Sequence, residues 1–224
     1  MQIIDATSVD GSGGRGVLVY GANGTGKTTL VRKLPPTVLY LDIDQSREVL
    51  KGMPGIKILG PILTTADLEA AGQMCLAAAQ KNPGKVQWVV VDSATILQGR
   101  YKRLNRHRAL AGEKGMNKWD VFTMGADEIL HTYEQWFTPL RTLGVNVLTL
   151  CNVDSMKDEG AGIVYKSPSL NVRDFRVSLI NWHGKVGRLR VGEGDVRVID
   201  WSAGQDFIAR DRSVPALLES IPEV

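Results

Sequence analysis

Short hydrophobic runs alternate along the chain with longer segments whose hydrophobic positions recur every three or four residues. Four continuous runs of Val, Ile, Leu and other apolar residues lie at residues 16–20, 37–43, 86–92 and 145–151. Such runs are typical of strands covered on both faces. Residues 65–80 and 121–143 instead have the spacing of one helix face. This alternation predicts an α/β fold with a mostly parallel central sheet flanked by helices.

The last part of the chain has a different pattern. Residues 185–191 and 196–201 are short apolar-polar segments separated by a Glu-Gly turn pair, which predicts a β-hairpin. Residues 206–212 predict a further short strand, and a C-terminal helix is expected from about Pro215. We therefore expect an antiparallel C-terminal edge, formed by residues 185–212, on the parallel sheet.

The chain of 224 residues is expected to form one domain, residues 1–224, with residues 1–15 as a flexible lead-in. Two cysteines far apart in the sequence favour a reducing compartment, and no hydrophobic run approaches the length of a membrane span. The three histidines have no metal-ligand spacing. These features predict a cytoplasmic protein that does not contact a membrane.

One segment, residues 21–28, matches the phosphate-binding motif G-x-x-x-x-G-K-[ST] in full. It lies between a predicted strand and a predicted helix, which is the context that supports the motif. Its glycines let successive N–H groups point inward at an anion, Lys27 would reach the β- and γ-phosphates, and the Thr28 hydroxyl would bind Mg²⁺. We predict that ATP and Mg²⁺ bind here. The predicted nucleotide-binding residues are Gly21, Ala22, Asn23, Gly24, Thr25, Gly26, Lys27, Thr28 and Thr29.

Acidic residues end two of the predicted strands. Asp92 ends an apolar strand in the manner of a Walker B element, whose carboxylate holds Mg²⁺ together with Thr28. The next residue is Ser93 rather than glutamate, so the general base comes from elsewhere. Asp42 and Asp44 end another strand with side chains in alternating directions, and Asp44 is our predicted base, with Asp42 as the alternative. The guanine-specific pattern N-K-x-D is absent, which argues against a GTPase.

The overall charge is small, but it is unevenly distributed. Lys and Arg number 27 and Asp and Glu number 24, a net charge of +3. Residues 100–118 alone contain seven basic residues and one acid, a net charge of +6, with Tyr101, His107 and the adjacent Trp119 as flat rings. Cations mixed with flat rings suit phosphate contact and base stacking on single-stranded DNA. The predicted DNA-binding residues are Arg100, Lys102, Arg103, Arg106, Arg108, Lys114 and Lys118, together with Lys157 and Lys166 from a second polar segment, residues 154–167. Residues 111–118 and 154–167 are both predicted to be loops.

The order of these motifs resembles the RecA-like P-loop ATPases, and more narrowly the short phage-encoded RecA-like single-strand annealing or AAA-type nucleotide-binding proteins. The resemblance spans about residues 16–220 and rests on the phosphate-binding loop, LDID, VVVDSAT and a late Arg-Asp-Arg. It implies that Asp44 stands where the family has a glutamate base. It also implies that Asn152 senses the γ-phosphate, and that Arg210 and Arg212 reach the nucleotide of a neighbouring subunit.

The leading functional hypothesis is an ATP-hydrolysing protein that acts on single-stranded DNA in recombination, annealing or repair as a ring or filament of its own copies. If the protein is phage-encoded, it would work in the host cytoplasm. The first alternative is a phosphotransferase of the nucleotide-kinase type, in which the basic segment forms a lid over the phosphates. The second is a nucleotide-gated DNA-packaging component with little turnover.

Overall fold

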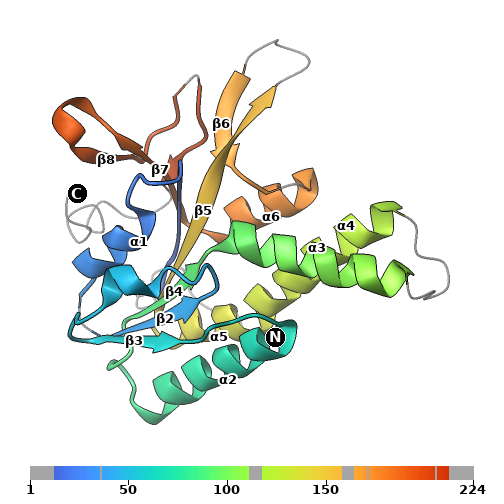
Figure 1. Cartoon of the computed structure of the whole chain (residues 1–224). Helices are drawn as coiled ribbons and strands as arrows, with labels where there is room; N and C mark the ends of the chain where they lie inside the picture. Colours follow the sequence, from blue (N-terminus) through green and yellow to red (C-terminus); the bar gives the residue numbers. More distant parts are fainter. Residues whose placement is uncertain are drawn as a thin grey trace, which may run out of the picture.

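The computed structural model describes residues 13–35, 37–110, 118–157, 164–170, 172–204 and 206–211. These residues form a nine-stranded sheet in which seven strands follow the order β3-β2-β4-β5-β1-β7-β8, while β6 pairs with β5 and β9 pairs with β7 (Figure 1). The strands are β1 (Gly16–Gly21), β2 (Val38–Asp42), β3 (Ile56–Leu59), β4 (Trp88–Asp92), β5 (Asn146–Lys157), β6 (Val164–Pro168), β7 (Lys185–Val191), β8 (Arg197–Asp200) and β9 (Arg210–Asp211).

The six neighbouring strands from β3 to β7 are all parallel, and β6, β8 and β9 pair antiparallel. The predicted fold class, a mostly parallel sheet with an antiparallel edge, is confirmed. Every residue of β1, β2 and β4 is buried, as expected of continuous apolar runs covered on both faces. The carboxyl ends of these strands therefore meet at one edge, where residues that follow them come together.

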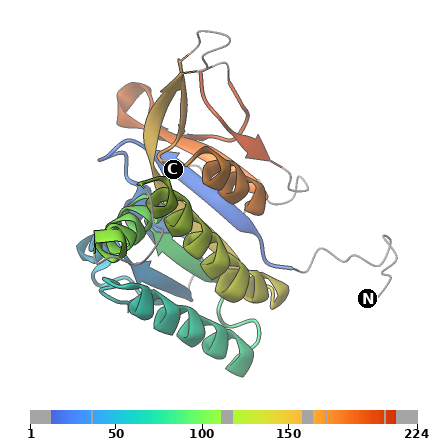
Figure 2. The ribbon, with the colours of Figure 1, turned by 90° about the vertical axis from the view of Figure 1, so that its right-hand side faces the viewer.

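Helices cover both faces of the sheet. They are α1 (Lys27–Leu30), α2 (Thr65–Lys81), α3 (Ala94–Leu110), α4 (Lys118–Thr132), α5 (Thr138–Thr142) and α6 (Arg173–Trp182), with 3₁₀ helices at Val31–Lys33, Arg47–Leu50 and Glu193–Asp195. Helices α2 to α6 pack on one face, and Figure 2 shows α2, α4 and α6 in front of the sheet. The short α1 and the two 3₁₀ helices that follow it along the chain lie on the other face with a smaller apolar cluster.

Two predicted elements differ from the structure. The helix expected over residues 121–143 begins at Lys118 and contains a π-helical turn, Tyr133–Phe137, before α5. Of residues 154–167, predicted to be a loop, 154–157 instead continue β5 and 164–167 belong to β6, with Met156 opposite Tyr165, while 158–163 lie outside the described residues. The prediction was wrong because this arm is polar and half exposed, so it lacks the apolar run by which buried strands are recognised.

The C-terminal edge follows the prediction closely. Strands β7 and β8 form the expected hairpin, and the expected short strand is β9, where Arg210 lies opposite Val186. Strand β3, at the opposite edge, was not predicted because its apolar residues alternate with a lysine over only four positions. The predicted lead-in before residue 13, the predicted loop at 111–117 and the predicted helix from residue 215 lie outside the described residues. Within the described ranges, no helix has both the length and the apolar character needed to cross a bilayer.

Candidate nucleotide site

The phosphate-binding loop leaves the carboxyl end of β1, between β5 and β7. Gly21 lies opposite Asn152 of β5 and Leu189 of β7. A Cβ atom on Gly21 would lie 2.5 Å from the Leu189 carbonyl oxygen, so only glycine fits there. Gly24 and Gly26 have φ angles of 81° and 92°, a left-handed conformation that glycine adopts without strain. These glycines explain why the loop bends back tightly before α1.

Lys27, the first residue of α1, folds over this loop. Its Nζ atom donates hydrogen bonds to the Gly21 and Ala22 carbonyl oxygens, each at 3.0 Å. Burial lowers the pKa of Lys27, and the nearby carboxylates of Asp92 and Asp44 oppose that shift. The ammonium group therefore lies at the mouth of the loop and within electrostatic reach of both acids.

Asp92, at the end of β4, is the centre of a hydroxyl cluster. Its Oδ2 atom accepts hydrogen bonds from Thr28 Oγ1 at 2.7 Å, Tyr40 OH at 2.8 Å and Ser46 Oγ at 3.3 Å. Asp92 is 1% exposed. The structure thus brings together the predicted pair Thr28 and Asp92, and it adds Tyr40 and Ser46, which sequence reasoning missed.

The oxygens of Thr28, Ser46 and Asp92 suit Mg²⁺, which prefers hard oxygen ligands. Among the described residues, no group of three or more His, Cys, Asp or Glu could hold a metal ion alone. Mg²⁺ in phosphate-transfer sites is commonly bound by one or two protein oxygens together with phosphate oxygens and water. The residues present therefore fit Mg²⁺ that arrives with a nucleotide.

The two candidate bases have different surroundings. Asp42 is fully buried and lies 3.5 Å from Arg47, on the side of the sheet that carries α1. Asp44 is exposed, and its backbone N–H donates to the Asp92 carbonyl oxygen at 2.8 Å. Partial burial and the Asp92 carboxylate raise the pKa of Asp44, while Lys27 and Arg100 lower it. Asp44 is thus the carboxylate that faces open space beside the phosphate-binding loop.

Asn152 belongs to the same edge. It is the partner of Gly21 in the β1–β5 pairing, and its backbone N–H donates to Thr95 Oγ1 at 3.0 Å. Its side chain is half-buried. The structure therefore places the predicted γ-phosphate sensor beside the first glycine of the loop.

A family model described as AAA domain matches residues 14–213, nearly the whole chain. The chain belongs to the AAA domain family. A search of the curated proteins found no match. Membership in this family indicates a P-loop ATPase fold that binds a nucleotide, typically with Mg²⁺, which agrees with the geometry of Lys27, Thr28 and Asp92.

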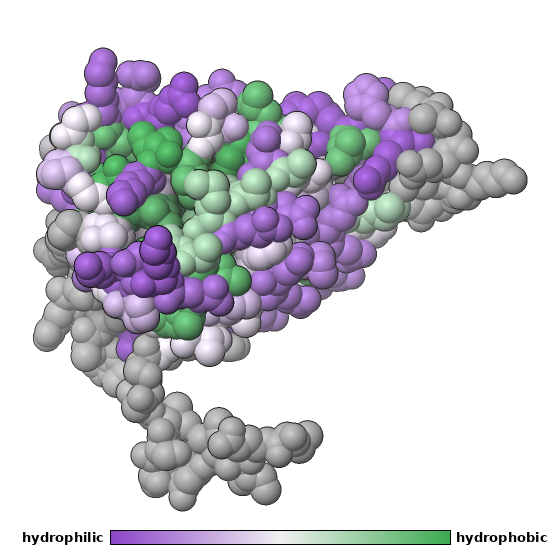
Figure 3. All heavy atoms as spheres, turned by 90° about the horizontal axis from the view of Figure 1, so that it is seen from below, coloured by the Kyte–Doolittle hydropathy of each residue, from purple (hydrophilic) through white to green (hydrophobic). Residues whose placement is uncertain are grey.

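The basic segment of this AAA domain protein is divided between several surfaces of α3. Arg103, Arg106 and His107 are exposed, whereas Arg108 is half-buried and forms an ion pair with Glu128 of α4 at 3.0 Å. Tyr101 is only 5% exposed, so the expectation that its ring stacks on bases was wrong. Figure 3 shows that the projection formed by α3 and α4 is mostly hydrophilic, while hydrophobic side chains gather over the body of the molecule.

Arg100, Lys102 and Lys118 have other positions. Arg100 lies in the first half of α3 and is half-buried; burial and the neighbouring Arg103 lower its pKa, while Asp44, Asp42 and Asp67 oppose that shift. Lys102 is half-buried. Lys118 begins α4, but its side chain, Lys114 and the Trp119 side chain lie outside the described residues.

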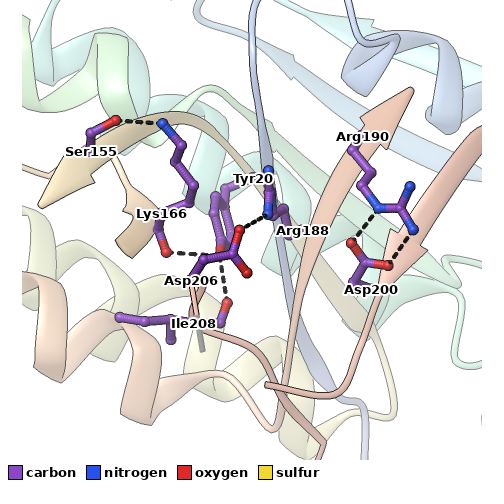
Figure 4. Close-up of polar contacts among 8 residues, drawn as sticks. All are labelled: Tyr20, Ser155, Lys166, Arg188, Arg190, Asp200, Asp206 and Ile208. Atoms are coloured by element: carbon purple, nitrogen blue, oxygen red, sulfur yellow. Dashed lines mark hydrogen bonds and ion pairs between the residues drawn. The ribbon is translucent and has the colours of Figure 1, made fainter. Parts of the chain in front are cut away.

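The second predicted DNA segment is the β5–β6 arm. Lys157 is exposed at the described end of β5, and Lys166 Nζ donates to Ser155 Oγ on the facing strand at 2.6 Å (Figure 4). The base of β6 is tied to β1, because Tyr20 OH donates to the Lys166 carbonyl oxygen at 3.2 Å. This arm continues from the edge of the sheet that carries the phosphate-binding loop.

Arg210 lies away from the nucleotide site of its own chain. Its strand, β9, pairs with the beginning of β7, whereas the phosphate-binding loop is level with the other end of β7. The guanidinium donates to Asn181 Oδ1 at 2.8 Å and approaches the His183 carbonyl oxygen at 3.4 Å. Action on a neighbouring copy stays a prediction, and Arg212 lies outside the described residues.

Proposed function

We propose that this AAA domain protein hydrolyses ATP with Mg²⁺, and that single-stranded DNA stimulates the reaction. The observation that carries the ATPase part is the 2.7 Å hydrogen bond between Thr28 Oγ1 and Asp92 Oδ2, within electrostatic reach of the Lys27 ammonium. A threonine hydroxyl from the loop and a strand-end carboxylate are the two protein groups by which P-loop enzymes hold Mg²⁺ on the β- and γ-phosphates.

The residues of the site divide the chemical work. Backbone N–H groups of the loop and the Lys27 ammonium would bind the phosphates, and Thr28 and Asp92 would hold Mg²⁺, which would neutralise charge on the phosphate oxygens. Asp44 orients a water for in-line attack on the γ-phosphorus and accepts its proton. The bond from the γ-phosphorus to the bridging oxygen breaks, which releases ADP and phosphate.

The DNA part of the proposal rests on the spacing of three arginines. Arg100, Arg103 and Arg106 are three residues apart on α3, so their side chains follow one another along neighbouring turns of the helix. Arg100 lies within electrostatic reach of Asp44, and Arg103 and Arg106 follow it along α3, away from the nucleotide site. We propose that single-stranded DNA binds along these three arginines and the β5–β6 arm, so that DNA binding changes the electrostatic potential at Asp44.

We propose further that several copies assemble on the DNA as a ring or filament, in recombination, annealing or repair. An ATPase core of this size has little surface of its own for a long nucleic acid. Electrostatic contacts with phosphates also weaken steeply as the salt concentration rises, so several copies together bind single-stranded DNA with higher overall affinity than one copy does.

Steady-state hydrolysis of ATP with and without a single-stranded oligonucleotide tests the proposal. We expect Mg²⁺-dependent release of phosphate that rises on addition of the oligonucleotide, and a larger species on sizing with a non-hydrolysable ATP analogue. Phosphate transfer to a nucleoside monophosphate would instead favour a kinase. Tight ATP binding with no turnover would favour a nucleotide-gated structural role.

A further inference from the structure

Arg197, the first residue of β8, contacts the phosphate-binding loop from the far end of the sequence. Its Nε atom donates a hydrogen bond to the Thr25 carbonyl oxygen at 3.0 Å. Its side chain also packs on Gly26, where an added Cβ atom would lie 2.5 Å from Nε and 2.9 Å from Cδ. Gly26 thus leaves room for this arginine as well as adopting the left-handed backbone that the loop requires.

No acid in the described part of the chain pairs with Arg197. The two arginines of β7 are each paired, Arg188 with Asp206 at 3.4 Å and Arg190 with Asp200 at 2.8 Å, as Figure 4 shows. Within the described ranges, Arg197 forms no ion pair, and the bond to Thr25 is its one hydrogen bond. A guanidinium has five N–H donors, so the four on its two Nη atoms remain available to a ligand.

We infer that Arg197 binds the polyphosphate of the nucleotide in the same chain. The inference rests on the proposed function, since it needs a nucleotide in this loop. The phosphate-binding loop presents N–H groups to an anion, and the guanidinium of Arg197 adds a positive charge beside it. A guanidinium is planar and can donate to two phosphate oxygens at once. Because β8 pairs with β7, which pairs with β1, the contact is made within one subunit and needs no neighbouring copy.

A purely structural role is the competing explanation. In that case Arg197 would hold the Thr25 carbonyl oxygen through Nε and never touch the nucleotide. The variant Arg197→Gln separates the two, because a glutamine amide still donates to that carbonyl but carries no charge. Arg197→Lys keeps the charge and loses the fork. Arg190→Gln is a matched control, because it removes from the same hairpin a charge that is already paired with Asp200.

The experiment measures the dissociation constants of MgADP and of inorganic tripolyphosphate for the wild type and these variants at two salt concentrations. We expect Arg197→Gln to weaken both ligands about tenfold or more, with a smaller salt dependence, as loss of a charged hydrogen bond implies. Arg197→Lys should recover part of the affinity, and Arg190→Gln should match the wild type. Melting without ligand reports separately on any loss of folding.

Two results would overturn the inference. If Arg197→Gln binds both ligands with wild-type affinity, Arg197 only holds the Thr25 carbonyl oxygen and does not bind the polyphosphate. A loss of ADP affinity with unchanged tripolyphosphate affinity would move the contact to the nucleoside. If the wild type itself binds neither ligand, the proposed function fails and not only the role of Arg197.

Discussion

The phosphate-binding loop and helix α3 both carry residues that the sequence predicts to be functional, but only the residues of the loop come together with their predicted partner in the structure. Residues 64 positions apart, Thr28 and Asp92, meet at 2.7 Å as the motifs imply. The basic residues of α3 instead separate into three groups: Arg108, which is paired with Glu128; the half-buried Arg100, which is within electrostatic reach of Asp44; and the exposed Arg103 and Arg106. A motif of fixed spacing determines which side chains meet in space. A count of charges describes only composition, and the period of the helix then determines on which face each charged side chain lies.

The largest effect is expected at the loop. Lys27→Ala removes the ammonium that lies over Gly21 and Ala22, so ATP affinity should fall about 10- to 100-fold or more, with turnover lost. Isothermal titration with MgATP measures this, and a melting curve verifies the fold. Near-wild-type affinity in Lys27→Ala would mean that the motif does not bind phosphate here.

The next effect concerns the base. Asp44→Asn should keep ATP affinity and lower kcat about 100-fold or more, since general-base catalysis is removed. Burial and Asp92 raise the pKa of Asp44 above its ordinary value, so the wild-type rate should fall as pH drops through that raised pKa. Asp44→Asn should lack this acid limb.

Asp42→Asn is the matched control for the base, because Asp42 is the other acid at the end of β2 and is fully buried beside Arg47. We expect its kcat to stay within about twofold of the wild type, because a group enclosed in this way does not reach an attacking water. A loss of turnover in Asp42→Asn with normal turnover in Asp44→Asn would exchange their roles.

A smaller effect separates the exposed arginines from the paired one. Arg103→Gln with Arg106→Gln should weaken single-stranded DNA binding and reduce the slope of log K against log salt by about 1.4, since each phosphate contact contributes about 0.7. Arg108→Gln should leave that slope unchanged, because its partner is Glu128. Fluorescence anisotropy over several salt concentrations measures both. Equal slopes in all three proteins would show that α3 is an ordinary solvated helix.

The last effect lies away from both regions and concerns the stability of the fold. His183 is fully buried, with Nδ1 2.6 Å from the Leu179 carbonyl oxygen and Nε2 2.8 Å from Thr149 Oγ1, and burial lowers its pKa to about 3. Because the pKa of His183 is lowered in the folded state, the residue contributes stability at pH values above its unfolded pKa of 6.5. This contribution is lost as the pH falls from 6.5 toward 3. Denaturant unfolding should show a loss of about 1.4 kcal/mol per pH unit below pH 6.5. His183→Gln should remove this contribution, and an unchanged slope would contradict it.

The sequence predicted those parts whose signal is local. Strands β1, β2 and β4 are continuous apolar runs, and the loop has a motif, so the central sheet and the pair Thr28 and Asp92 could be placed in advance. Strand β3 and the β5–β6 arm are partly exposed, and their mixed composition resembles that of loops. Arg197 is separated from Thr25 by 172 positions, so no pattern along the chain indicates their contact.

The most direct test is the ratio of ATP hydrolysis rates with and without single-stranded DNA, measured for the wild type and for Arg103→Gln with Arg106→Gln. If the loop performs the chemistry and the exposed arginines of α3 bring DNA to it, both proteins will have the same basal rate. Only the wild type will then be strongly stimulated at moderate oligonucleotide concentration. Equal stimulation of the two proteins, or a wild type that DNA does not stimulate, would contradict this coupling.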